Sequence, residues 1–124
     1  MLGDKNAAVT IAVKDTKSAG KFYENTLGLK PSPARESKVL SYKSGNSTVL
    51  VYESQFAGTN KATAATWVVD DVEGVVRDLK SKGVSFEHYD FPHGTRKGDV
   101  HVMGETKAAW FKDPDGNILS VVNG

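Results

Sequence analysis

Apolar and polar residues follow an order that occurs twice along the chain. Residues 7–15 (AAVTIAVKD) and 62–71 (ATAATWVVDD) are β-rich runs that end in an aspartate, Asp15 or Asp71. A helical pattern follows each aspartate, with apolar residues three and four positions apart. These residues are Ala19, Phe22, Tyr23 and Leu27 in the first half, and Val72, Val75, Val76 and Leu79 in the second. Gly28 and Gly83 are placed to end the helices, and each aspartate is placed to cap a first turn.

Three strand-like segments follow the helix in each half. In the first half they are 29–34, 37–44 and 47–54. In the second half they are 84–91, 107–112 and 117–122, with a polar, glycine-rich stretch at 92–104 that predicts a mobile loop over a site. The sequence therefore predicts an α+β fold of two tandem βαβββ modules within one domain. The modules are expected at about 7–53 and 63–123, with a polar connector at 54–62.

The last two apolar runs are joined by the turn Asp-Pro-Asp-Gly at 113–116. Pro114 fixes φ at the second turn position, Asp113 can accept hydrogen bonds from the turn backbone, and Gly116 can adopt a positive φ. The strand that follows alternates between two faces. Ser120 is the polar residue on a face that otherwise carries Ile118 and Val122. It is either a small filler or part of a site.

Composition changes this picture mainly by exclusion. The net charge is +1 and the 16 Lys and Arg are scattered, so no basic patch indicates a nucleic-acid partner. No apolar run approaches the roughly 20 residues of a membrane span, and residues 1–9 lack the features of a signal peptide. We therefore expect a cytoplasmic protein that binds neither nucleic acid nor a membrane. The absence of cysteine excludes disulfides and thiolate metal sites.

Three motifs carry a resemblance to a known superfamily. VKDTKSAGKFYENTLGL, WVVDDVEGVVRDLKSKGV and WFKDPDGNILSVV occur in the order found in the vicinal oxygen chelate superfamily. That superfamily includes glyoxalase I, the bleomycin-resistance proteins and the extradiol dioxygenases. The resemblance implies a glyoxalase/bleomycin-resistance-like fold, in which paired βαβββ modules form a curved sheet cup around a small-molecule site. It also implies a homodimer.

The resemblance further identifies the positions where metal-dependent members hold their ion. Applied to this chain, they fall on Ala8, Ala64 and Ser120, while a fourth lies near residues 49–51. The nearest carboxylate to that fourth position, Glu53, comes too late in its strand. Alanine offers no ligand atom and neutral serine is a poor one, so we expect neither a metal nor another cofactor. Glyoxalase-type activity is therefore disfavoured, and the resemblance to the bleomycin-resistance branch favours binding without catalysis.

Strand alternation predicts which residues line the site. If Ala8 and Ala64 face the cavity, Thr10 and Thr66 lie beside them, while the alternate residues pack under the helices. Trp110 lies on the opposite strand face from Phe111, and is either a stacking platform for a planar or cationic ligand or a packing residue. Ser120 completes this predicted lining. Tyr42 and Tyr52 can also line it, but the sequence leaves their facing open.

Three histidines lie close together in the sequence, at His88, His93 and His101. Their spacing matches no standard metal-ligand pattern, which favours solvated loop histidines. They form the alternative hypothesis of a lyase, isomerase or dioxygenase-like enzyme with a relocated site at the histidines and Asp90, in which Asp90 or Asp99 pairs with a histidine. A second alternative is a structural or regulatory dimer whose cup is filled by its own side chains.

Overall fold

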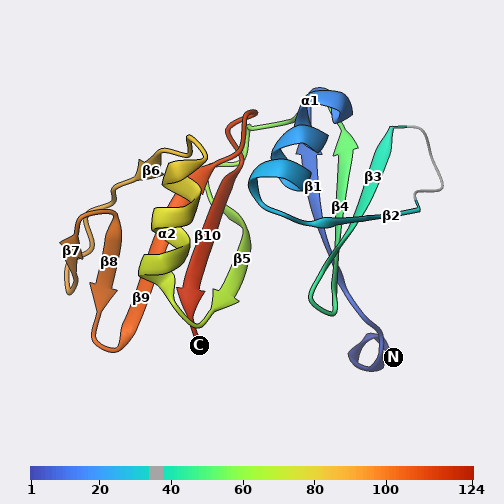
Figure 1. Ribbon diagram of the computed structural model, residues 1–124. Helices are drawn as coiled ribbons and strands as arrows, with labels where there is room; N and C mark the ends of the chain where they lie inside the picture. Colours follow the sequence, from blue (N-terminus) through green and yellow to red (C-terminus); the bar gives the residue numbers. More distant parts are fainter. Residues whose placement is uncertain (34–37) are drawn as a thin grey trace. The chain divides into compact units, whose positions relative to one another are not determined.

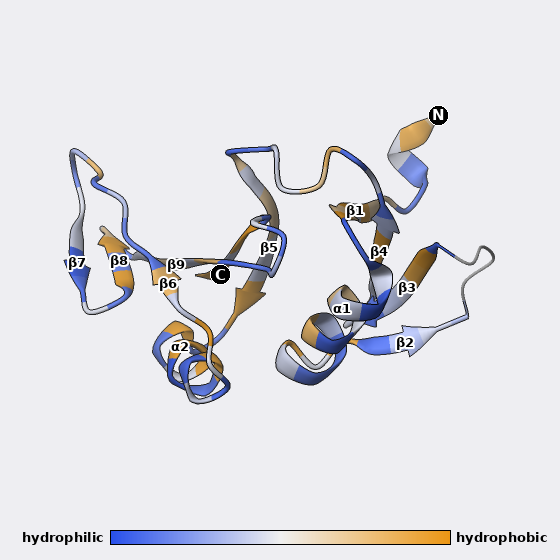
Figure 2. Cartoon of the chain, turned by 90° about the horizontal axis from the view of Figure 1, so that it is seen from above, coloured by the Kyte–Doolittle hydropathy of each residue, from blue (hydrophilic) through white to orange (hydrophobic). Residues whose placement is uncertain are grey.

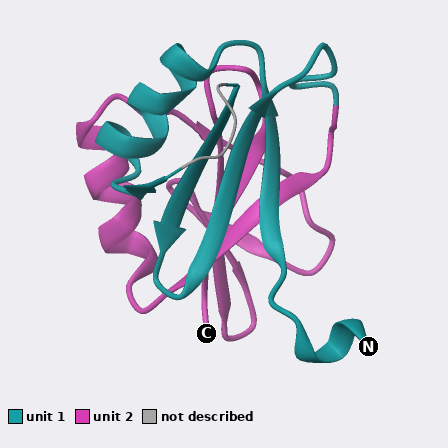
Figure 3. Ribbon diagram, turned by 90° about the vertical axis from the view of Figure 1, so that its right-hand side faces the viewer, with its two compact units in different colours: residues 1–59 teal, residues 60–124 magenta. Residues whose placement is uncertain are grey.

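The computed structural model describes residues 1–33 and 38–124 (Figure 1). Within it the chain divides into two compact units, Met1–Thr59 and Asn60–Gly124 (Figure 3). The division falls inside the stretch 54–62. The strand predicted at 29–34 ends at Ala34, and the strand predicted at 37–44 begins at Ser37. Both of these residues lie outside the described part of the chain.

Unit 1 has the βαβββ order that its sequence predicts. A short 3-10 helix, η1 (Leu2–Asp4), precedes the module, whose elements are β1 (Ala8–Val13), α1 (Thr16–Lys21), the π-helical turn η2 (Phe22–Thr26), β2 (Lys30–Ser32), β3 (Val39–Ser44) and β4 (Ser47–Glu53). The sheet order is β1-β4-β3-β2. β1 and β4 are parallel, and the other neighbours are antiparallel.

Alternating burial along β1 and β4 defines the core of unit 1. Ile11 and Val13 are 1% and 0% exposed, while Thr10 and Ala12, which alternate with them, are exposed and half-buried. Val49 and Val51, the buried residues of β4, share the face of Ile11 and Val13 because Val51 is the register partner of Ile11. The predicted packing of the odd-numbered residues of β1 is therefore confirmed.

The two helix starts and stops also follow the sequence pattern. The Asp15 side chain accepts a hydrogen bond from the backbone N–H of Lys17, and the Asp71 side chain accepts one from that of Gly74. Gly28 and Gly83 have φ of 76° and 92°, the left-handed conformation that glycine adopts without steric cost after a helix. Local chemistry thus sets these boundaries.

Unit 2 contains β5 (Thr63–Val69), α2 (Val72–Ser81), β6 (Phe86–Glu87), β7 (Thr95–Lys97), β8 (Val100–Met103), β9 (Thr106–Lys112) and β10 (Ile118–Asn123). The sheet order is β5-β10-β9-β8-β7, and β6 pairs with β9 as well. As in unit 1, the first and last strands of the unit lie side by side and parallel.

Two sequence expectations for unit 2 are wrong. The strand predicted at 84–91 covers only the two residues of β6. The loop predicted at 92–104 contains the antiparallel hairpin β7–β8, with Gly98 at φ 61° in its turn. The reason is that β8 pairs with β9, and this pairing buries Val100 and His101. The stabilisation comes from the neighbouring strand, so the glycine-rich, polar pattern of 92–104 does not reveal it.

Helix α2 covers one face of the unit 2 sheet. Lys107 of β9 forms an ion pair with Glu73 of α2 at 2.7 Å, so the odd-numbered residues of β9 point toward the helix. Phe111 is 1% exposed on this face, and its register partner Leu119 is 0% exposed. Figure 2 shows apolar and polar residues interleaved along α2, whose buried residues are Val72, Val76 and Leu79. In the described part of the chain, no helix has the length and apolar character needed to cross a membrane.

Candidate functional site

The turn between β9 and β10 has the chemistry predicted for it. Asp113 is only 4% exposed, and its Oδ1 accepts hydrogen bonds from the backbone N–H groups of Asp115 at 3.0 Å and Asn117 at 2.8 Å. Its Oδ2 accepts a third from the Asn117 side chain at 2.8 Å. Gly116 has φ 92°. This buried network fixes the register of the hairpin and, with it, the position of Ser120.

Ser120 lies in the middle of the sheet face that points away from α2. Its register partners are Thr66 on β5 and Trp110 on β9, so the three side chains form a row across three strands. Ser120 is 3% exposed, whereas Thr66 is exposed. The structure therefore brings together three of the predicted lining residues, and the row carries hydroxyl groups and an indole ring.

The positions that correspond to a metal site do not fit a metal ion. In unit 2 they hold Ala64, which has no ligand atom, and Ser120, whose strand neighbours in the row are uncharged. In unit 1 the corresponding position is Ala8. Glu53, the carboxylate nearest to the fourth position, is bonded elsewhere: it accepts hydrogen bonds from the backbone N–H and the hydroxyl of Thr16 at the start of α1, both at 3.2 Å. Within residues 1–33 and 38–124, no three His, Asp or Glu side chains are grouped so as to hold a cation.

Trp110 belongs to an aromatic cluster on the same sheet face. Its ring centroid lies 5.0 Å from that of His101, 5.4 Å from that of Phe91 and 5.5 Å from that of Tyr89. Its indole N–H donates to the Thr63 hydroxyl at 3.2 Å. Phe111, its neighbour in sequence, packs at 5.6 Å against Phe86 on the helix side. The opposite facing of Trp110 and Phe111 is as the alternation predicts.

His101 is not the solvated loop histidine that the sequence suggests. It lies on β8 and is 2% exposed, because β8 is held in the sheet by β9. Its Nε2 accepts a hydrogen bond from the backbone N–H of Tyr89 at 3.0 Å, while its Nδ1 has no partner among the described residues. His93 does lie exposed in a turn, as expected.

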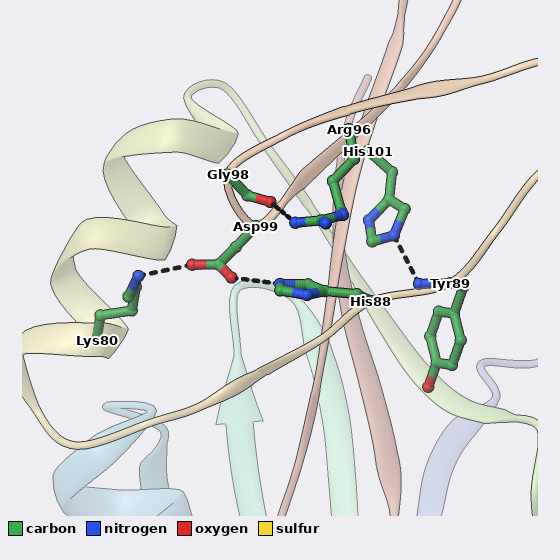
Figure 4. Close-up of polar contacts among 7 residues, drawn as sticks. All are labelled: Lys80, His88, Tyr89, Arg96, Gly98, Asp99 and His101. Carbon is green, nitrogen blue, oxygen red and sulfur yellow. Dashed lines mark hydrogen bonds and ion pairs between the residues drawn. The ribbon is translucent and has the colours of Figure 1, made fainter.

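His88 pairs with Asp99 rather than with Asp90. The Asp99 carboxylate is 2.7 Å from His88 Nε2 through Oδ1 and 2.7 Å from Lys80 Nζ through Oδ2 (Figure 4). These hydrogen bonds, first that of Lys80 and then that of His88, hold the pKa of Asp99 below its ordinary value. Asp90 is exposed. The sequence left Asp90 and Asp99 open as partners of a histidine, and the structure selects Asp99, which lies in the turn between β7 and β8 and also joins this turn to α2.

A pocket of about 110 Å³ lies beside His101 in unit 2. Tyr89, Phe91, Thr95, Arg96 and His101 contribute to its lining, together with Asp90. Arg96 is the register partner of His101 across the β7–β8 hairpin. Sequence reasoning missed this pocket as a unit because it depends on a hairpin that was expected to be a loop.

The predicted site residues of unit 1 separate onto the two faces of their sheet. Thr10 is exposed on β1, and Tyr52 is 37% exposed on the same face, since it is the register partner of Ala12. Tyr42 lies on the other face, 1% exposed, and its hydroxyl donates to Glu24 at 2.9 Å. Burial and then this hydrogen bond raise the pKa of Tyr42 above its ordinary value. Its position is that of a core residue.

Comparisons with known proteins agree with this geometry. The chain is similar to a crystal structure of a glyoxalase family protein from Enterococcus faecalis, at 19% identity and a TM-score of 0.75, covering 99% of this chain and 100% of that one. It is also similar to lactoylglutathione lyase from Agrobacterium tumefaciens, at 16% identity and a TM-score of 0.72, covering 98% and 94%. A third similar structure is the genomically encoded fosfomycin resistance protein FosX from Listeria monocytogenes, at 16% identity and a TM-score of 0.72, covering 95% and 91%.

These similarities concern the fold, which they share over nearly the whole chain. No curated protein sequence matches the chain. The family model for the Glyoxalase/Bleomycin resistance protein/Dioxygenase superfamily, in contrast, matches residues 6–121. This match accounts for the repeated βαβββ order and for the parallel pairs β1–β4 and β5–β10 in the two sheets. It also accounts for the terminal hairpin β9–β10. The chain belongs to the glyoxalase/bleomycin resistance protein/dioxygenase superfamily.

Proposed function

We propose that this protein binds a small molecule without the help of a metal ion, on the face of the unit 2 sheet that points away from α2. The observation that carries the proposal is the row Thr66, Ser120 and Trp110, with Ser120 at one of the positions where the resemblance places a metal ligand. Because alanine and serine stand where metal-binding side chains are expected, this face can contact a small molecule directly but cannot activate it through a bound cation.

The chemistry of this face suits a ligand with a planar ring and polar groups. The hydroxyls of Thr66 and Ser120 can donate and accept hydrogen bonds, and the Trp110 ring offers a flat apolar surface. A small number of fixed polar groups beside aromatic side chains is the usual make-up of a small-molecule site. The ligand can be a drug or a metabolite, and sequestering it is the function that such a site supports.

The enzymatic alternative receives less support. It needs His88, Asp90, His93 and His101 to act together, yet His88 is bonded to Asp99 and His101 to the Tyr89 backbone. Metal analysis of protein purified without chelators separates the two hypotheses. A stoichiometric divalent metal that is lost in His93→Ala or His101→Gln contradicts the binding-only proposal.

A ligand panel tests the proposal directly. Both tryptophans, Trp67 and Trp110, lie in unit 2, so the thermal unfolding of this unit can be followed by tryptophan fluorescence. In the presence of EDTA, we expect at least one class of planar compound to raise the midpoint, since a ligand that binds only the folded state stabilises it. Thr66→Phe covers the exposed end of the row and should abolish the shift. Ser85→Phe, at an exposed position outside the sheet, is the matched control and should not.

The homodimer implied by the resemblance is a separate proposal. Multi-angle light scattering at several protein concentrations tests it. A monomer mass over the whole range contradicts it.

A further inference from the structure

One buried polar atom of unit 2 has an unmet hydrogen bond. Among the described residues that are not exposed, the only buried side-chain nitrogen or oxygen without a partner is His101 Nδ1. The Tyr89 backbone N–H donates to Nε2, so Nε2 carries a lone pair and the ring proton lies on Nδ1. The unmet group is therefore an N–H donor. Buried donors without an acceptor are rare in native proteins, and such a group needs an acceptor, which a bound ligand can supply.

A second donor faces the same pocket. Arg96 is opposite His101 on the neighbouring strand, and both residues line the pocket of about 110 Å³. Figure 4 shows the guanidinium of Arg96 and the imidazole of His101. The Arg96 Nη1 donates to the Gly98 carbonyl at 2.6 Å, which holds the side chain in place and uses one of its five N–H donors. The Thr95 hydroxyl lies in the same lining.

Aromatic rings form the apolar part of the lining. Tyr89 and Phe91 contact each other at 6.4 Å between centroids, and both contact the His101 ring, at 6.2 and 5.5 Å. Trp110 extends this apolar surface toward Ser120. The pocket and the row Thr66, Ser120 and Trp110 therefore lie on one continuous face.

The donors of the pocket, rather than its net charge, favour an anion. The lining has one cationic group, Arg96, and one anionic group, Asp90, and both are exposed, so water screens the two charges alike. Arg96 has further N–H donors beyond the one bound to Gly98, and His101 Nδ1 has no partner among the described residues, whereas the Asp99 carboxylate nearby is already bound by Lys80 and His88. A carboxylate matches the donors, because its two oxygens can accept from a guanidinium and from an imidazole N–H.

We propose that this pocket binds the carboxylate end of a planar aromatic acid, with the acid's ring against Tyr89 and Phe91. The inference rests on the proposed function, since it names the ligand class for the same sheet face. Drug-sized ligands occupy roughly 300–1,000 Å³. The pocket is smaller, so it holds one end of the ligand, and the remainder extends along Trp110 toward Ser120.

Benzoate is the probe, and benzamide, its neutral isostere, is the matched control compound. Binding is followed by ¹H–¹⁵N NMR through the Tyr89 amide and the His101 ring N–H. We expect benzoate to shift both signals saturably and benzamide to bind at least about tenfold more weakly, as the loss of charge-assisted hydrogen bonds implies. Asp90→Asn should tighten benzoate binding because it removes the one anionic group of the lining.

Variants separate the roles of the two donors. His101→Gln keeps an acceptor for the Tyr89 N–H but leaves no donor at the Nδ1 position, since the glutamine N–H groups lie at the end of a longer side chain, and it should weaken benzoate binding by about tenfold or more. Arg96→Gln, at an exposed position, should do the same without disturbing the fold. Lys97→Gln removes the same charge from the opposite face of β7 and should change the affinity less than about twofold.

Three results overturn the proposal: benzamide binding as tightly as benzoate, no saturable shift with benzoate, or unchanged affinity in folded His101→Gln and Arg96→Gln. If His101→Gln does not fold, Arg96→Gln decides. When neutral compounds of the panel bind at Thr66 and benzoate does not, this inference fails while the proposed function stands. When no compound of any charge binds, the proposed function fails as well.

Discussion

The Asp113 carboxylate is expected to be a main determinant of the stability of unit 2. It is 4% exposed and accepts three hydrogen bonds within the turn between β9 and β10. Asp113→Ala removes all three acceptor contacts and leaves the Asn117 backbone N–H and side-chain amide without this partner. The hairpin whose register pairs Ser120 with Trp110 then loses its closing network.

The magnitude follows from which donors are buried. The two Asn117 donors make buried hydrogen bonds, and each costs about 1–3 kcal/mol when its acceptor is removed. The Asp115 N–H is partly exposed and can bond to water instead. The free energy of unfolding should therefore fall by about 2–6 kcal/mol. With a urea m-value of about 1–2 kcal/mol/M for a unit of this size, the midpoint falls by at least about 1 M.

Urea unfolding followed by tryptophan fluorescence measures this change, because Trp67 and Trp110 both report on unit 2. Asp115→Ala is the matched control: it removes a carboxylate from the same turn, where Asp115 contributes only its backbone N–H to the network. We expect it to change stability by less than about 0.5 kcal/mol. The reasoning is refuted if Asp113→Ala and Asp115→Ala unfold at the same urea concentration with unchanged m-values.

Two further predictions concern titrating groups. The pKa of Asp99 is lower in the folded protein than its ordinary value of 3.8, so its pairing stabilises the fold above about pH 4 and this contribution is lost as the pH falls through the folded-state pKa. Asp99→Asn should therefore flatten the loss of stability between about pH 5 and 3 in urea titrations, and an unchanged pH profile speaks against the pairing. The pKa of Tyr42 is raised, so the phenol should stay protonated when exposed tyrosines ionise near about pH 10. Tyr42→Phe should leave the absorbance change of tyrosine ionisation up to about pH 11 undiminished, and a smaller change would show that Tyr42 ionises normally.

The sequence by itself determines the features that depend on neighbouring residues. Asp15 and Asp71 cap their helices because a side-chain acceptor two or three residues before a free N–H needs no tertiary partner. The same holds for the turn at 113–116, where Asp113 bonds residues within its own turn. Alternation along β1 and β10 likewise follows from strand geometry. The duplicated order of these local signals is enough to indicate the βαβββ modules and the superfamily.

Only the tertiary structure decides which residues of separate segments meet. The stretch 92–104 becomes a hairpin because β8 can pair with β9, and this pairing buries His101. Asp99 bonds Lys80 of α2 and His88, which directly follows β6, and the facing of Tyr42 depends on the register of β3 with β4. Each of these contacts joins two separate segments, even where the two are neighbours in sequence, as β8 and β9 are. Its free energy belongs to the pairing, so neither segment shows it in its own periodicity or spacing. The pocket beside His101 is a product of such pairings, so the sequence did not predict it. The candidate role of Ser120, in contrast, follows from its place in a sequence motif.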